Sequence, residues 1–487
     1  KVSVEMEREA ALIPVRRAVL NPGAPAMAFV RAAAEDAYDR LIFPSVEREM
    51  RGLLTEQADE GAIKMFGLNL KPLLMQPPVK GFVTMGLDPG YRNGCKVAVV
   101  DATGKVLDTA VVYPTFSQRK KEEAIDTLAK LIRRHGVAHI AIGNGTASRE
   151  TEQMTVELIK RLGGGVSYMI VNEAGASVYS ASKLAAEEFP DYDVNLRSAV
   201  SIARRLQDPL AELVKIDPKS IGVGQYQHDM PQARLDETLS GVVEDCVNAV
   251  GVDLNTASAP LLSYVAGLNN TTARNIVKYR EENGAFTTRK GVLKVPKLGP
   301  KAFEQCAGFL RVPESRNVLD HTGVHPESYG AAEALLALCG YGLSDVKAGG
   351  LDGLRERVAA YGEEKAAEVC GVGVPTLRDI VGELVKPGRD PRDELPRPIL
   401  RTDVLEMKDL KPGMELTGTV RNVIDFGVFV DIGVHQDGLV HISQLREGRR
   451  VQHPSEVCAV GDIVTVWVLE VDEKKKRISL TMKKPKG

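Results

Sequence analysis

Five short runs of alternating apolar residues lie close together near the C-terminal end of the sequence, and they constrain the fold more than any other feature. They span Met414–Val423, Phe426–Ile432, Gly438–Ile442, Ile463–Asp472 and Arg477–Met482. Alternation with a period of two is typical of strands that bury one face. Five such strands within about 70 residues predict a small closed β-barrel.

A second region, which begins near Gly81, changes its hydrophobic period several times. Three strand-like runs are followed by a charged amphipathic helix at 120–134, a buried run at 139–143, a helix that ends near 162 and a last run at 167–171. A meander of strands followed by alternating helices and strands predicts an α/β layer with a mixed sheet.

The remaining segments read as helical, and the chain is too long for one core. A length of 487 residues exceeds the roughly 250–300 residues at which single cores stop growing. We predict a multidomain α+β protein with a helical region at 1–80, an α/β domain at 81–251, paired helical hairpins at 252–325, a helical segment with a Pro-rich linker at 326–404, and the barrel at 405–487.

Composition excludes several classes of protein. The 63 basic and 65 acidic residues give a net charge of −2, so any nucleic-acid surface must be a local patch. The six cysteines form no CxxC pair, which fits a reducing cytoplasm and predicts no zinc site. No apolar run is long enough to cross a membrane. Because the chain starts at Lys1 without a signal peptide, we expect a fragment that lacks an N-terminal part.

The predicted barrel resembles the S1-type RNA-binding OB fold along its whole length. The resemblance rests on Gly418-Thr-Val-Arg-Asn-Val-Ile-Asp-Phe-Gly-Val-Phe-Val-Asp-Ile, on Asp437-Gly-Leu-Val-His-Ile-Ser and on the C-terminal Lys-rich strand. It implies that nucleic acid contacts Arg421, Phe426, Phe429, His441 and Arg477. An aromatic ring on a strand can stack on a base, which is worth roughly 1–3 kcal/mol.

Two alternatives limit that expectation. Residues three apart on a strand face opposite sides, so one or both phenylalanines could instead fill the barrel interior. Residues 413–484 contain ten basic and ten acidic side chains, which predicts only modest phosphate attraction from the barrel alone.

A weak repeat between about Asn255 and Val312 resembles tandem helix–hairpin–helix motifs. Its two glycines, Gly267 and Gly299, lie 32 residues apart and each precedes a predicted helix. In such motifs the glycine lets the backbone approach a phosphate, and helix N–H groups hold the anion. The predicted contact residues are Gly267, Asn269, Lys297, Gly299 and Lys301.

The charge of this segment supports the resemblance. Nine cations (Arg274, Lys278, Arg280, Arg289, Lys290, Lys294, Lys297, Lys301 and Arg311) face three anions (Glu281, Glu282 and Glu304), which gives +6. A local patch of this sign is typical of a phosphate-binding surface. The alternative is a helical packing module with solvated lysines.

The α/β region resembles RNase H-like domains of the RuvC and YqgF resolvase type, because Asp88 ends its first strand. Such enzymes place several carboxylates around two Mg²⁺ ions. The candidates here are Asp88, Glu173 and Asp245. At the strand end where resolvases carry a further acid, this sequence has Gly143-Asn144-Gly145. We therefore expect an inactive scaffold with a vestigial site, no catalytic residue and no metal; the alternative is a metal-dependent nuclease that uses the three acids.

The order of these segments resembles the Tex family of bacterial RNA-binding transcription accessory proteins. Gly222-Val-Gly-Gln-Tyr-Gln-His-Asp and Lys386-Pro-Gly-Arg-Asp-Pro-Arg also resemble that family. The resemblance implies a cytoplasmic, non-catalytic, monomeric binder of RNA and DNA that prefers single strands, needs no cofactor and acts near RNA polymerase. A translation-associated RNA binder is a further alternative, because S1-type barrels also occur on ribosomal proteins.

Overall fold

The computed structural model describes residues 3–403, 407–424, 426–434, 436–448, 451–472 and 475–484. The chain divides into two compact units. One comprises Lys1–Leu68 with Gly224–Thr238, and the other comprises Asn69–Val223 with Leu239–Gly487. The predicted boundary between residues 404 and 405 lies outside the described residues.

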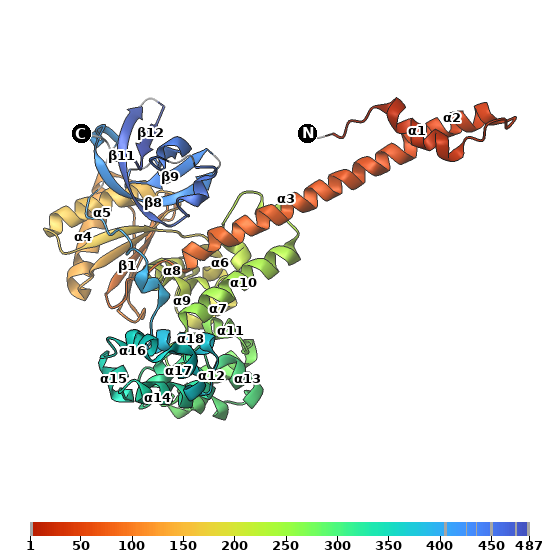
Figure 1. Ribbon diagram of the computed structural model, residues 1–487. Coiled ribbons are helices and arrows are strands. Elements are labelled where there is room, and N and C mark those ends of the chain that lie inside the picture. Colours follow the sequence, from red (N-terminus) through yellow and green to blue (C-terminus); the bar gives the residue numbers. More distant parts are fainter. Residues whose placement is uncertain are drawn as a thin grey trace. The chain divides into compact units, whose positions relative to one another are not determined.

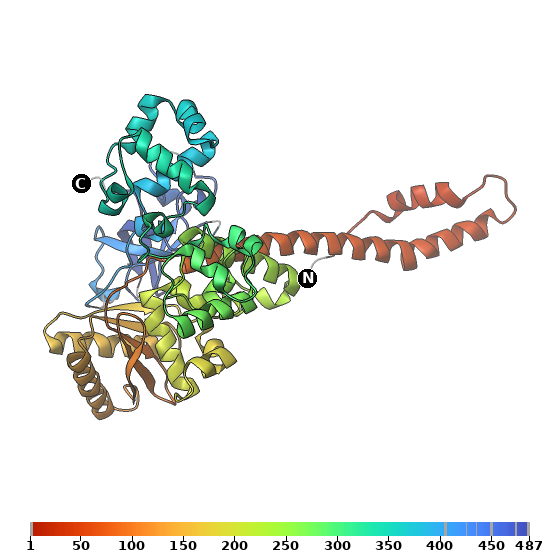
Figure 2. The same ribbon diagram turned by 90° about the horizontal axis from the view of Figure 1, so that it is seen from below.

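The N-terminal unit is helical, as the sequence predicts. Helix α1 (Arg8–Val19) lies beside a continuous helix that joins α2 (Met27–Ala37) to α3 (Phe43–Leu74) through a π-helical turn at Tyr38–Ile42 (Figure 2). Pro44 has no N–H to donate, and in a regular helix its ring would collide with the carbonyl of Arg40. A π turn at this point relieves that collision.

The mixed sheet of the second unit has the strand order β3-β2-β1-β4-β5. Its strands are β1 (Thr84–Asp88), β2 (Cys95–Val100), β3 (Val106–Val112), β4 (His139–Gly143) and β5 (Ser167–Val171). Strand β1 pairs antiparallel with β2 and parallel with β4. The predicted meander and α/β layer are therefore confirmed.

Helices cover both faces of this sheet (Figure 1). Buried residues of α4 (Gln118–His135) and α5 (Ser148–Leu162) share one core with β1, β2 and β4. Helix α8 (Val194–Gln207) packs on the other face, against Ala98 and Val100. It approaches β1 so closely that a Cβ atom on Gly86 would lie 2.1 Å from the carbonyl oxygen of Ala199. Only glycine fits there, and the contact fixes α8 over the end of β1.

Further helices follow this layer and lead into the hairpin region. They are α6 (Ala176–Ala181), α7 (Lys183–Glu188), α9 (Pro209–Leu213), α10 (Gln232–Val250), α11 (Ala259–Ser263), α12 (Asn270–Asn283) and α13 (Pro300–Cys306). Two short parallel strands, β6 (Val252–Asp253) and β7 (Leu310–Arg311), join the two ends of the hairpin pair.

A compact group of five helices comes next (teal in Figure 2). They are α14 (Tyr329–Leu338), α15 (Leu343–Ala348), α16 (Leu354–Tyr361), α17 (Glu363–Cys370) and α18 (Val374–Val385), packed around a common core that includes Leu335, Leu354 and Leu377. The predicted helical segment is confirmed.

The C-terminal strands close into a barrel with the order β10-β12-β11-β8-β9. They are β8 (Glu415–Ile424), β9 (Gly427–Asp431), β10 (Gly438–His441), β11 (Ile463–Asp472) and β12 (Arg477–Thr481). Val428, Val430, Val440, Val466 and Leu480 fill its interior. The predicted barrel is confirmed.

The segment predicted as a linker is anchored rather than loose. Arg392 is 1% exposed, and its guanidinium forms ion pairs with Asp208 and Asp390 at 2.7 Å each. Farther along, Arg401 exchanges backbone hydrogen bonds with Tyr168 of β5. Proline content alone predicts a linker, but it does not reveal that one arginine has a buried partner about 180 residues away.

No helix in the described residues is both long and apolar enough to cross a membrane.

Candidate nucleic-acid interface

Both predicted aromatic residues of the barrel face solvent. Phe429 is half-buried on the outer face of β9, between the inward-facing Val428 and Val430. Phe426 is 53% exposed in the turn that precedes β9, where the two-residue alternation of a strand does not apply. Neither ring fills the interior, so the alternative of two core phenylalanines is wrong.

The strand register brings His441 next to the aromatic residues. Phe429 lies opposite Leu439, and Gly427 lies opposite His441. A Cβ atom on Gly427 would lie 2.4 Å from the carbonyl oxygen of Val440, so glycine allows this close pairing. The backbone N–H of Ile442 donates to the carbonyl of Phe426 at 2.9 Å. Phe426, Phe429 and exposed His441 therefore lie together on one outer surface, which we call the aromatic face.

The two predicted arginines of the barrel differ in their surroundings. Arg477 begins β12, is exposed, and shares the outward-facing side of that strand with Ser479, which pairs with Leu439. Arg421 instead binds the carboxylate of Asp431 at 2.7 Å, and Arg401 binds the same carboxylate at 3.1 Å. Burial alone would raise the pKa of Asp431, but these two cations hold it below its usual value. Of the two predicted phosphate contacts, Arg477 is thus the one with fewer partners within the described residues.

The two helical hairpins share a register that differs from the predicted one by two residues. Val265 and Val295 are both buried, and each carbonyl accepts from the N–H three residues later. The residue with a left-handed backbone is Gly267 (φ +79°) in the first hairpin and Lys297 (φ +66°) in the second. The repeat length is therefore 30 residues, and Gly267 corresponds to Lys297 rather than to Gly299.

Gly299 takes the position of Asn269, at the start of a helix. Asn269 caps α12 by accepting from the N–H groups of Thr271 and Thr272 at 2.9 and 3.0 Å. Gly299 precedes α13 and has no side chain to do the same. Lys297 and Lys301 are both exposed beside this uncapped turn. The sequence match of the two glycines suggested a wrong pairing, because glycine serves two different roles here.

Of the nine cations counted in this segment, one is buried and two are half-buried. Arg289 is fully buried and donates to the backbone carbonyls of Leu319, Asp320, Thr322 and Val324. Arg280 and Arg311 also donate to backbone carbonyls. The exposed cations are Arg274, Lys278, Lys290, Lys294, Lys297 and Lys301. With the three exposed glutamates, the surface charge is +3 rather than +6.

At the resolvase-like site the structure brings together two of the three predicted acids. Asp88, at the end of β1, accepts a hydrogen bond from the hydroxyl of Ser198 on α8. Glu173 follows β5, and the negative charge of Asp88 acts on it. Asp245 is exposed on α10, and in the described residues no three acidic, histidine or cysteine side chains form a metal-binding group. The helix that covers β1 is α8, so the assignment of Asp245 to this site is wrong.

Glu173 occupies space left by glycines. A Cβ atom on Gly143 would lie 2.2 Å from Oε2 of Glu173, and one on Gly145 would lie 1.7 Å from Oε1. Burial, and then the nearby Asp88, raise the pKa of Glu173, and its Oε2 has no hydrogen-bond partner. Asn144 accepts from the N–H of Glu173 at 3.0 Å. The Asn144 amide thus orders this loop. It stands at the position where the resemblance to resolvases predicted an acid.

Positive charge near this pair comes from the protein itself. Lys96 lies opposite Asp88 in the strand register, and its charge lowers the pKa of Glu173 in part. Buried Arg205 donates to the carbonyls of Asn172 and Ala174 at 2.7 and 2.9 Å, which holds the loop that carries Glu173. The arrangement has two carboxylates, one hydroxyl and a neighbouring ammonium, a poor donor set for two Mg²⁺ ions.

A second pair of hairpins, which the sequence pattern did not predict, lies in the helical segment. Gly340 (φ +73°) and Gly371 (φ +68°) each end a helix, and the next glycine, Gly342 or Gly373, precedes the following helix. Both segments repeat the pattern found at Gly267: a residue with a left-handed backbone is followed by an apolar residue and then by the residue that precedes a helix. The signal was Gly-Tyr-Gly and Gly-Val-Gly, each between helical segments. Residues 326–385 contain five cations and ten anions, so this pair lacks a phosphate-attracting charge.

Comparison with known families matches four consecutive parts of the chain. Residues 82–207 match the Tex protein YqgF-like domain, 247–311 a helix-hairpin-helix motif, 317–392 an HHH domain and 409–483 the S1 RNA binding domain. The transcriptional accessory protein Tex of Neisseria gonorrhoeae is 56% identical over 445 residues, which cover 91% of this chain and 57% of that protein. Most of the chain is thus similar to proteins of the Tex family. Its S1 and hairpin domains support a nucleic-acid-binding role.

Other relatives agree over the same region. The protein YdcI of Bacillus subtilis is 55% identical over 469 residues, 96% of this chain and 65% of YdcI. The chain thus spans 57–65% of the length of these two relatives. The Thermus thermophilus RuvC structure covers 27% of this chain and 95% of its own, with 15% identity and a TM-score of 0.22, too slight a likeness to support an argument.

Proposed function

We propose that this chain is a non-catalytic nucleic-acid-binding part of a transcription accessory factor. The barrel binds single strands of RNA or DNA through its aromatic face, and the hairpins at Gly267 and Lys297 bind backbone phosphates. The observation that carries the proposal is the gathering of Phe426, Phe429 and His441 on one outward surface. Aromatic rings exposed on a barrel stack on bases without reading their sequence.

Several finer features belong to the same proposal. The chain acts as a monomer in the cytoplasm, near RNA polymerase, without a cofactor. The name of the Neisseria gonorrhoeae relative, a transcriptional accessory protein, supports the link to transcription. The balance of acidic and basic side chains in the barrel favours stacking over charge as the source of its affinity.

A titration of the full chain with single- and double-stranded RNA and DNA tests the binding mode. Phe429→Ala is expected to weaken single-strand binding about 5- to 100-fold, the equivalent of roughly 1–3 kcal/mol for one stacked base. Phe116→Ala serves as the matched control, because Phe116 is 56% exposed outside the barrel. Equal affinities for wild type and Phe429→Ala would contradict the proposal.

The absence of catalysis has its own test. A two-metal nuclease needs several charged oxygen ligands, whereas Asp88 is hydrogen-bonded to Ser198 and Asp245 lies elsewhere on exposed surface. We expect single strands, duplexes and four-way junctions to stay intact with Mg²⁺ or Mn²⁺. Cleavage that is lost in Asp88→Asn would favour the nuclease alternative.

A further inference from the structure

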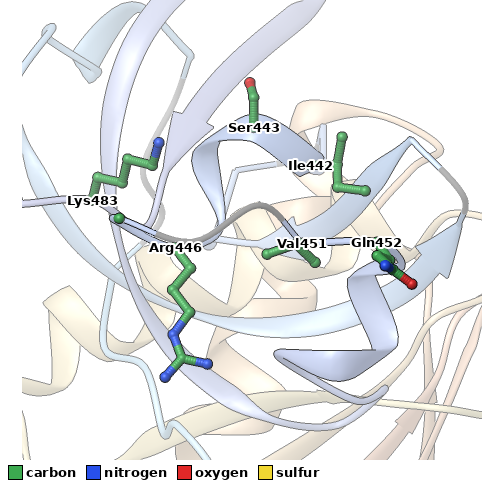
Figure 3. Close-up of a pocket in the computed structure, with 7 residues that line it drawn as sticks. Ile442, Ser443, Arg446, Val451, Gln452 and Lys483 are labelled. Carbon is green, nitrogen blue, oxygen red and sulfur yellow. The ribbon is translucent and has the colours of Figure 1, made fainter.

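The barrel has a pocket beside the aromatic face. It has a volume of about 890 Å³ and is lined by Ile442, Ser443, Arg446, Val451, Gln452 and Lys483. Figure 3 shows Arg446 and Lys483 on one side of the view, with Ile442, Val451 and Gln452 on the other. Because Ser443, Arg446 and Gln452 are exposed, the pocket opens to solvent. Its size lies in the range of ligand-binding clefts.

The charge in this pocket is positive and uncompensated. Among the described residues that line it, the ionisable ones are Arg446 and Lys483, and none is acidic. Within the described residues, neither the guanidinium nor the ammonium takes part in an ion pair or hydrogen bond, unlike Arg421, which is bound to Asp431. Glu447 follows Arg446 in the chain but does not line the pocket. Two unpaired cations in one cleft favour an anion with several oxygen acceptors, such as a phosphate.

The other lining residues suit the rest of a nucleotide. Ile442 and Val451 are half-buried and apolar, and a sugar or base can lie against them. Ser443 and Gln452 add a hydroxyl and an amide that can donate or accept. Such a mixture of apolar wall and few polar groups is typical of a site that holds one ligand unit in a fixed orientation.

The pocket also adjoins the aromatic face. The ring Nδ1 of His441 lies 2.9 Å from the hydroxyl oxygen of Ser443, and Ile442 donates its N–H to the carbonyl of Phe426. The short 3₁₀ helix at Ile442–Gln444 thus starts at the aromatic face and lines the pocket. A strand stacked on Phe426 and His441 would reach the pocket with its next nucleotides.

We propose that this pocket binds a phosphate-bearing nucleotide of the same single strand that lies on the aromatic face. The inference rests on the proposed function, because the aromatic face supplies the first nucleotides. Arg446 and Lys483 bind the phosphate, and the apolar wall contacts the sugar and base. The pocket therefore extends the length of strand that the barrel covers.

The experiment measures how tightly the full protein chain binds single strands of two lengths. The variant Arg446→Gln/Lys483→Gln is titrated with a trinucleotide and with a twelve-nucleotide strand of the same base composition, over a series of salt concentrations. The control Lys347→Gln/Lys365→Gln removes the same charge from exposed sites in the helical segment. Phe429→Ala, titrated alongside, reports on the aromatic face.

For the pocket variant we expect roughly threefold to tenfold weaker binding of the longer strand and unchanged binding of the trinucleotide. The slope of the affinity against salt concentration should be smaller by about 0.7 for each phosphate that the pocket no longer neutralises. The control leaves both strands unaffected. Equal weakening for both lengths would indicate general charge attraction and would overturn the pocket assignment. Unchanged binding of the longer strand, while Phe429→Ala weakens it, would reject the pocket alone. No effect of either variant would reject the proposed function as well.

Discussion

Single residues that look alike in the sequence have different roles in the folded chain. Arg289 and Lys290 are adjacent cations in a basic segment, yet Arg289 is fully buried and Lys290 is exposed. Composition counts both as surface charge. Which one turns inward depends on the carbonyls of residues 319–324, a contact between segments that local sequence does not encode.

Arg289→Met and Lys290→Met form a matched pair. Removal of Arg289 leaves several buried carbonyls without a donor, so we expect a loss of about 2–4 kcal/mol in stability. Lys290→Met should change stability by less than about 0.5 kcal/mol and weaken nucleic-acid binding slightly. Thermal melting and filter binding measure the two effects. Equal melting temperatures for the two variants would show that the buried hydrogen bonds of Arg289 do not stabilise the fold.

The raised pKa of Glu173 predicts that its substitution stabilises the folded protein, and that this effect depends on pH. Burial and Asp88 raise its pKa in the folded protein, so its ionised form destabilises the fold at any pH above that raised value. Once the pH falls below the pKa of the unfolded chain, about 4.3, the carboxyl is protonated in both states and the penalty disappears.

Glu173→Gln is therefore expected to raise the melting temperature at pH 7, and the difference from wild type should vanish near pH 4. Glu187→Gln, at an exposed site, is the control and should show no such trend. A variant that melts lower than wild type at pH 7 would contradict the assignment of a destabilising carboxylate.

At the scale of elements, periodicity predicted the strands and helices well. The five barrel strands and the mixed sheet lie within a few residues of the expected positions, because each buries one face and so shows its period. Contacts between elements were harder to predict. The predicted hairpin register was shifted by two residues, and Asp245 was grouped with Asp88 and Glu173. Both errors arose because the positions of glycines and acids in a sequence do not show which surfaces meet in the fold.

Lys297→Gly tests the corrected hairpin register. A left-handed backbone disfavours a side chain by roughly 1–2 kcal/mol, so glycine at this position should stabilise the hairpin by up to about 1 kcal/mol. The same change removes a cation and should weaken binding of unrelated sequences equally. Melting and salt-dependent titration follow the two effects. Gly299→Ala, at a position with φ −85°, is the comparison; lower stability of Lys297→Gly than of wild type would refute the register.

At the scale of the whole molecule, the Pro-rich segment links parts of the chain through specific contacts. Arg392, with Asp208 and Asp390, forms a buried ion group that Lys80 approaches at 3.4 Å from Asp208. Burial alone would raise the pKa of Asp208, but Arg392 holds it below its usual value. The ion group therefore weakens as the pH falls through that lowered pKa.

We expect Arg392→Gln to make residues 386–398 more susceptible to limited proteolysis at pH 7, several-fold in cleavage rate, because two buried carboxylates lose their cation. Arg397→Gln, exposed in the same segment, is the matched control. Wild-type protein should show the same increase at acidic pH. Identical digestion of the two variants would mean that the segment is a loose linker after all.

The most direct test of strand binding by the barrel is to locate where a single strand lies on the full chain. Photo-crosslinking of a thiouridine-substituted RNA, followed by mass spectrometry of the linked peptides, reports which residues lie against the bases. We expect crosslinks concentrated at Phe426, Phe429 and His441, with fewer in the hairpin region around Lys297. Crosslinks confined to residues 82–207, with none in the barrel, would contradict the proposed binding mode.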